Sequence, residues 1–212
     1  MRSFSGVKGS RFFFCKRPNK PSSQLSKQRI MQEYLDTLKA LLKENKTTGT
    51  NHSEDMLHYT KMNLSRMKRW MKTGKLDNQL VEAVKAIKAP QTWVVLTEGW
   101  CGDAAHTVPF IAKLAELNPN ITLDIKMRDE NLELIDNYLT NGGRSIPKLI
   151  AFDETNKEIF NWGPRPEKMQ EAFYEMKELN LPYTEVSESL QKMYNDDKGV
   201  GFQNEIQRKL VE

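Results

Sequence analysis

The sequence predicts an α/β fold in which helices flank a central sheet, with helical extensions at both ends. Three observations lead to this expectation. Residues 91–97 form a short apolar, β-rich run that leads directly into a turn carrying a cysteine, Cys101. Strand and helix patterns then follow in the order βαβα-ββα over about residues 88–180. Apolar residues at helical spacing stand before and after that region.

Within residues 88–180, each element follows from a local pattern. The first strand is expected at 91–97, and a helix starts at Cys101 and continues through Pro109. Its apolar face comprises Val108, Phe110, Ile111, Leu114, Ala115 and Leu117. The further strands are expected at 121–127, 149–152 and 158–162, and the further helices at 130–140 and 166–179. Asn141-Gly142-Gly143 reads as a glycine C-cap that ends the helix at 130–140.

The rest of the chain divides into a leader and two helical extensions. Residues 31–87 are expected to form an N-terminal helical extension that covers the central domain, and residues 181–212 a C-terminal one. The expected helices are 31–45, 53–72, 77–88, 184–194 and 203–210, with a loop at 195–199.

Residues 1–30 have the composition of a disordered segment, rich in Ser, Lys and Arg and free of acidic residues. Two interpretations remain open. The segment is an organellar transit peptide, or it is an overextended reading frame whose natural start is Met31, and we favour the second. On that interpretation the protein is expected in the cytoplasm. No apolar stretch is long enough to cross a bilayer, so no membrane partner is expected.

The formal charge of +4 comes from this leader. Residues 1–30 contain eight Lys and Arg, so the remaining 24 basic residues face 28 acidic ones, a net charge of −4. A mildly acidic domain lacks the basic face that nucleic acids require. We therefore expect no nucleic-acid partner.

Several short motifs stand in order along the chain. They are Trp-Cys-Gly-Asp-Ala at 100–104, Arg-Asp-Glu-Asn at 128–131, Leu-Thr-Asn-Gly-Gly at 139–143, Ser-Ile-Pro-Lys at 145–148 and Trp-Gly-Pro-Arg-Pro at 162–166. Together they resemble the thioredoxin-like superfamily, and in it the bacterial group with a single-cysteine Trp-Cys-Gly-Asp-Ala site. The resemblance implies a thioredoxin fold with a mixed sheet. It also implies a cis Ile146–Pro147 bond beside the active-site cysteine.

The active-site motif lacks the second cysteine of a thioredoxin, since Ala104 stands in its place. A lone Cys101 can form only a mixed disulfide, which a thiol from elsewhere must resolve. The resemblance also implies a buried acid six residues before the cysteine, and this chain has Val95 there. Cys101 is the candidate catalytic residue. The candidate binding residues are Trp100, Gly102, Asp103, Ile146, Pro147 and Arg165.

The charge state of Cys101 depends on two opposing effects. The helix N-terminus favours a thiolate by ~0.3 to 2 kcal/mol, whereas Asp103 opposes it by roughly 1 to 4 kcal/mol. We therefore expect a thiol pKa nearer the free value of about 8.5 than 6. Glu98 is expected to be a solvated turn residue, with a proton donor as the alternative.

Arg165 follows a proline in the loop that the resemblance places beside the cis-proline and near Asp103. Our hypothesis is that it pairs with Asp103 or receives a substrate carboxylate, such as one of glutathione; the alternative is an exposed arginine at a helix start. His106 lies more than one helical turn from Cys101, so we do not expect the two to pair. Cys15 is expected to be an idle, reduced thiol.

Two functions remain. In the first, which we favour from the sequence, Cys101 forms mixed disulfides with protein clients or with a low-molecular-weight thiol such as glutathione as co-substrate. In the second, a groove of Trp100, Ile146 and Pro147 binds extended peptide without redox chemistry. Neither needs a cofactor or a metal. The sequence does not specify the oligomeric state.

Overall fold

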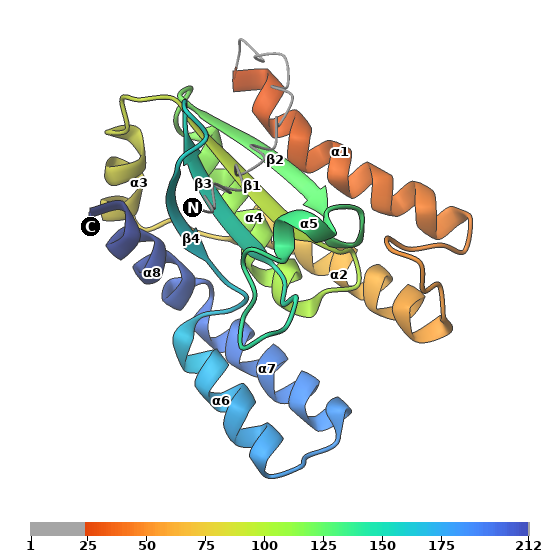
Figure 1. The fold of residues 1–212 in the computed structure, drawn as a ribbon. Helices are drawn as coiled ribbons and strands as arrows, with labels where there is room; N and C mark the ends of the chain where they lie inside the picture. Colours follow the sequence, from red (N-terminus) through yellow and green to blue (C-terminus); the bar gives the residue numbers. More distant parts are fainter. Residues whose placement is uncertain (1–23, 212) are drawn as a thin grey trace, which may run out of the picture.

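The computed structural model describes residues 24–211 (Figure 1). The first helix, α1 (Gln24–Lys43), begins before the start expected at Met31, so the last part of the predicted leader is helical. The remainder of the leader, with Cys15, lies outside the described residues. Within residues 24–211, no helix combines the length and the apolar character needed to cross a membrane.

The central sheet is mixed, which confirms the predicted α/β class. Its strands are β1 (Gln91–Thr97), β2 (Ile121–Met127), β3 (Lys148–Asp153) and β4 (Glu158–Trp162), in the order β2-β1-β3-β4. β1 runs parallel to β2 and antiparallel to β3, which in turn pairs antiparallel with β4. β1 is a central strand and is buried over its last five residues, as its apolar run predicts.

Seven further α-helices surround or flank this sheet in the described chain. They are α2 (Glu54–Thr73), α3 (Asn78–Lys85), α4 (Gly102–Glu116), α5 (Leu132–Ile135), α6 (Glu167–Glu178), α7 (Tyr183–Asp197) and α8 (Val200–Val211). α1 lies along β2, α8 lies beside α3, and α6 and α7 form a hairpin that projects below the sheet (Figure 1). The loop expected at 195–199 is shorter than predicted because α7 continues to Asp197.

The helical extensions share one hydrophobic core with the central domain. Leu38 of α1, Met67 of α2, Trp93 of β1, Phe110 of α4 and Phe202 of α8 belong to the same cluster, and each is at most 1% exposed. Burial of a side chain of this kind stabilises the fold by about 1.5–3 kcal/mol. The α6–α7 hairpin has a small cluster of its own, formed by Met169, Val186, Leu190 and Tyr194.

The prediction of a single helix at 130–140 is wrong. A 3-10 turn at Arg128–Glu130 and the one-turn helix α5 replace it, separated by Asn131, whose backbone is not helical. The Asn131 side-chain amide donates to the carbonyl oxygen of Met127 at 2.7 Å. Asparagine side chains compete for backbone hydrogen bonds in this way and favour turns over helix interiors.

The glycine C-cap expected after that helix is also wrong. Thr140 and Gly143 exchange both of their backbone hydrogen bonds around Asn141 and Gly142, which have φ angles of +48° and +77°. Two successive residues at positive φ are the signature of a tight hairpin turn of the primed type, for which Asn-Gly is the preferred pair. The Asn-Gly dipeptide therefore marks a turn between Thr140 and Gly143.

Candidate functional site

Strand β1 delivers Cys101 to the start of α4 through the turn at Glu98, Gly99 and Trp100. Elements from the N-terminal extension hold this turn. The Gly99 N–H donates to Thr48 Oγ1 at 2.8 Å, and the Gly99 carbonyl accepts from Asn63 Nδ2 at 3.1 Å. A Cβ on Gly99 would lie 2.6 Å from a methyl group of Leu38, so α1 packs directly against the turn backbone. The extension is thus part of the site.

Cys101 is the N-cap residue of α4 and is 6% exposed. Its thiol donates to the Ile146 carbonyl oxygen at 3.3 Å, and its sulfur accepts the Ala104 N–H at 3.5 Å. Burial raises the pKa of the Cys101 thiol to about 12, with a smaller contribution from Asp103. The expected opposition from Asp103 is therefore present, but burial is the larger cause, and the pKa lies above the value near 8.5 that we expected.

Ile146 and Pro147 lie directly beside the cysteine, and their peptide bond is cis. Both residues are buried, as is Cys101 beside them. The loop after β4 packs closely against Pro147. A Cβ added to Gly163 of this loop would lie 2.2 Å from the Pro147 carbonyl oxygen. The Lys148 ammonium group ties the two segments together by donating to the Gly163 carbonyl at 2.9 Å.

Arg165 and Asp103 form a nearly buried ion pair, as the first part of our hypothesis predicts. Arg165 donates through Nε at 3.1 Å and through a terminal nitrogen at 2.6 Å to the two carboxylate oxygens of Asp103. Their side chains are 11% and 13% exposed, so the alternative of an exposed arginine is wrong. The Tyr194 hydroxyl donates to the same carboxylate at 2.7 Å, and the guanidinium lies 4.2 Å from the ring centre of Phe173. The pair thereby anchors the α6–α7 hairpin to the start of α4.

His106 does not contact Cys101, in agreement with the sequence. Instead its Nδ1 accepts the indole N–H of Trp70 at 2.9 Å, its Nε2 contacts the Gln191 amide, and its ring stacks on Tyr194 with 4.5 Å between ring centres. Burial lowers the pKa of His106 to about 3, so the ring is neutral at physiological pH. A neutral histidine thus joins α2, α4 and α7, a role that its position in the sequence does not reveal.

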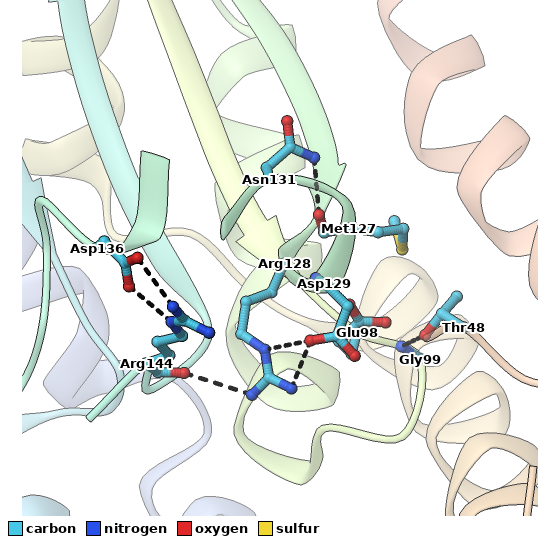
Figure 2. A network of polar contacts seen from close by, with 9 residues as sticks. All are labelled: Thr48, Glu98, Gly99, Met127, Arg128, Asp129, Asn131, Asp136 and Arg144. Carbon is cyan, nitrogen blue, oxygen red and sulfur yellow. Dashed lines mark hydrogen bonds and ion pairs between the residues drawn. The ribbon is translucent and has the colours of Figure 1, made fainter. Parts of the chain in front are cut away.

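Glu98 is not the solvated turn residue that we expected, because its side chain is fully buried. Figure 2 shows it beside Thr48 and Asp129, and its Oε1 accepts the Asp129 N–H at 2.9 Å. Burial raises the pKa of Glu98, while hydrogen bonds from Thr48 and the Asp129 N–H oppose that rise. Arg128 pairs with the Asp129 carboxylate at 2.7 Å. Glu98 therefore joins the cysteine turn to the segment after β2.

A pocket of about 80 Å³ opens beside the first turn of α4, between α2 and the α6–α7 hairpin. Its walls carry aromatic rings, two arginines, one carboxylate and several polar side chains. The lining residues used below are Tyr59, Arg66, Trp100, Asp103, His106, Arg165, Tyr183, Ser187 and Gln191. Of the site residues predicted from the sequence, Trp100, Gly102, Asp103 and Arg165 line it, whereas Cys101, Ile146 and Pro147 do not.

A larger hollow of about 540 Å³ lies on the other side of Arg165, among β4, α6 and α8. Three of its charged side chains, Glu167, Glu205 and Arg208, contact one another or nearby groups. Glu205 accepts hydrogen bonds from the Trp162 indole and from the Glu167 N–H, and Arg208 pairs with the Glu167 carboxylate. The smaller pocket is the better candidate for a ligand site, because it adjoins the cysteine turn.

The fold and the turn at Cys101 define a thioredoxin-fold protein. Residues 49–179, more than half of the chain, match the family model described as Thioredoxin, and the chain belongs to the thioredoxin family. No curated protein matches the sequence.

Two solved structures are similar in fold. The first is a protein of unknown function from Pseudomonas aeruginosa, PA1234, at 18% identity and a TM-score of 0.46, covering 66% of this chain and 82% of that one. The second is an HIV epitope-scaffold, at 16% identity and a TM-score of 0.47, covering 77% of this chain and 89% of that one.

Proposed function

We propose that this thioredoxin-family chain is a redox-inactive module that binds a peptide segment of a partner protein, without a cofactor, and that Cys101 is a neutral thiol of its site. The burial of Cys101 carries this proposal. With a pKa of about 12, the thiolate fraction at pH 7 is on the order of 10⁻⁵. A free cysteine reaches a few per cent. Since the thiolate is the nucleophile, the resting site is poorly suited to disulfide exchange.

The surface around the pocket supports a peptide as the ligand. The turn between α6 and α7 carries the exposed apolar side chains Leu179 and Leu181, and the exposed Tyr183 that begins α7 also lines the pocket. Exposed apolar side chains that gather next to a pocket are typical of a surface that contacts another polypeptide. The proposed partner therefore covers this turn and inserts one group into the pocket. A cytoplasmic location belongs to the proposal, because a reducing compartment keeps a free thiol such as Cys101 reduced.

The second candidate function is mixed-disulfide exchange with a protein or a small thiol such as glutathione. The N-cap position of Cys101 favours it, because the Ala104 N–H and Arg165 both lower the thiol pKa. These two contributions are smaller than the effect of burial. Exchange would thus require a change that exposes the thiol, and we place this function second.

A pair of serines on α7 allows the binding proposal to be tested. Ser187 lines the pocket, whereas Ser189 is exposed on the same helix. Ser187→Trp places a ring in the pocket and is expected to weaken binding of a dye-labelled pool of random decapeptides by roughly tenfold or more. Fluorescence anisotropy measures the affinity, and circular dichroism checks that each variant is folded.

Ser189→Trp is the matched control and should bind as the wild type does. Cys101→Ser should also retain binding, because the thiol is not the recognition group in this proposal. Absence of binding by the wild type, or equal effects of the two tryptophans, would overturn the proposed function. Loss of binding in Cys101→Ser alone would favour the mixed-disulfide function.

A further inference from the structure

Arg66 of α2 has an unusual setting in the pocket wall. Its side chain is half-buried, and one terminal nitrogen donates to Asn63 Oδ1 at 2.9 Å. Asn63 is fully buried and donates in turn to the Gly99 carbonyl. The guanidinium is therefore held in place through Asn63 by the turn that precedes Cys101. This arrangement fixes one edge of the guanidinium and orients the group next to the pocket.

The charges in the pocket do not balance. Two guanidinium groups line it, Arg66 and Arg165, against the single carboxylate of Asp103. Asp103 uses both oxygens on Arg165. Among residues 29–211, no carboxylate forms an ion pair with Arg66. His106 adds no charge, because its pKa is about 3.

A half-buried cation without a counter-ion is costly. Burial lowers the pKa of Arg66, and the positive charge of Arg69, one turn further along α2, lowers it as well. Desolvation disfavours the charged form, and no fixed carboxylate compensates for it here. A carboxylate supplied by a ligand would form charge-assisted hydrogen bonds with the free edge of the guanidinium. The electrostatics of the pocket thus favour an anion.

The size of the pocket limits which anion enters. Pockets for whole small molecules have volumes of about 300–1,000 Å³, and this one has about 80 Å³. It accommodates one terminal residue or one acidic side chain. Tyr59 and Tyr183 both line the pocket and meet edge to face, with 6.5 Å between their ring centres. A chain end with a carboxylate fits these limits.

We propose that Arg66 receives the C-terminal carboxylate of a peptide whose last residue enters the pocket. This inference rests on the proposed function and specifies its ligand class. The carboxylate accepts hydrogen bonds from the Arg66 guanidinium, and the preceding residues pass Tyr59 and Tyr183 toward the exposed turn between α6 and α7. Free chain ends would then be preferred over internal segments.

The test compares two forms of the same decapeptide pool, one with a free C-terminal carboxylate and one with a C-terminal amide. Wild-type protein is expected to bind the free acid roughly 10- to 100-fold more tightly. Arg66→Gln should abolish this preference by weakening binding of the free-acid pool. Lys68→Gln, which removes an exposed charge on the same helix, should keep the preference. An amidated pool ending in aspartate shows whether a side-chain carboxylate substitutes for the chain end.

The comparison on wild-type protein stands even if Arg66→Gln does not fold. Equal affinities for acid and amide would overturn the assignment of Arg66 while leaving the peptide-binding function intact. Binding of neither pool would overturn both. Equal binding of the free acid and the amidated aspartate pool supports a carboxylate subsite but contradicts its restriction to chain ends.

Discussion

Replacing Arg165 by methionine is expected to lower the free energy of unfolding by roughly 3 kcal/mol. The substitution leaves the Asp103 carboxylate at a site where it is 13% exposed, with the Tyr194 hydroxyl as its remaining side-chain donor. An uncompensated buried charge costs far more than the loss of an exposed ion pair. The substitution also removes one of the contacts that link the α6–α7 hairpin to α4. Urea denaturation followed by circular dichroism measures the change.

The pair formed by Arg144 and Asp136 is a matched control. Arg144 contacts both carboxylate oxygens of Asp136, at 2.6 and 2.9 Å, but the two side chains are 45% and 46% exposed. Arg144→Met should cost much less than Arg165→Met, because water screens an exposed ion pair. Asp103→Asn in the Arg165→Met background should recover part of the lost stability, because it removes the unpaired charge and retains an acceptor for Tyr194. A cost for Arg165→Met no larger than that for Arg144→Met would contradict this interpretation.

Gly163→Ala is expected to destabilise the fold by roughly 3 to 5 kcal/mol. Two physical effects combine. Gly163 has a φ of +118°, which residues with a side chain rarely adopt, and its added Cβ would lie 2.2 Å from the Pro147 carbonyl oxygen. To relieve that contact, either the loop after β4 or the segment of Ile146 and Pro147, which covers the Cys101 thiol, must move. The same denaturation experiment measures the cost.

Gly142→Ala separates the two effects. Gly142 also has a positive φ, +77°, but a Cβ there meets no atom within 4 Å. Its substitution should cost about 1–2 kcal/mol from the backbone alone. If the two alanine variants lost the same stability, close packing of Gly163 on Pro147 would not be a determinant of the fold.

Much of the fold follows from local patterns in the sequence. The strands at 91–97, 121–127 and 158–162 have the predicted bounds, because apolar runs between turn residues define them at short range. The segment at 130–140 could not be assigned correctly in this way. Its apolar spacing suits a helix, but asparagine side chains bond to the backbone and break it.

The site was predictable only in part. The resemblance to thioredoxins predicted that Cys101, Asp103 and Arg165 lie close together. The opposite charges of Asp103 and Arg165 then predicted the ion pair that the structure contains. The site residues on α2 and α7 could not be predicted, because no motif in the sequence marks them. Arg66 and Tyr194 lie far along the chain from Cys101, and each is an ordinary residue of an amphipathic helix until tertiary packing places it. The burial of Glu98 is likewise set by the packing of the loop after α1.

The most direct test of the account is the pH dependence of Cys101 alkylation by iodoacetamide, followed by intact mass in a Cys15→Ser variant. Because burial raises the thiol pKa to about 12, the thiolate population and the rate should rise with pH and show no plateau up to about pH 10. Asp103→Asn should shift the profile to lower pH, since that carboxylate raises the same pKa. The account predicts that at pH 7 the native thiol reacts at least roughly 100-fold more slowly than the unfolded chain. A rate that reaches its half-maximum near pH 6 would contradict the account and favour a mixed-disulfide enzyme.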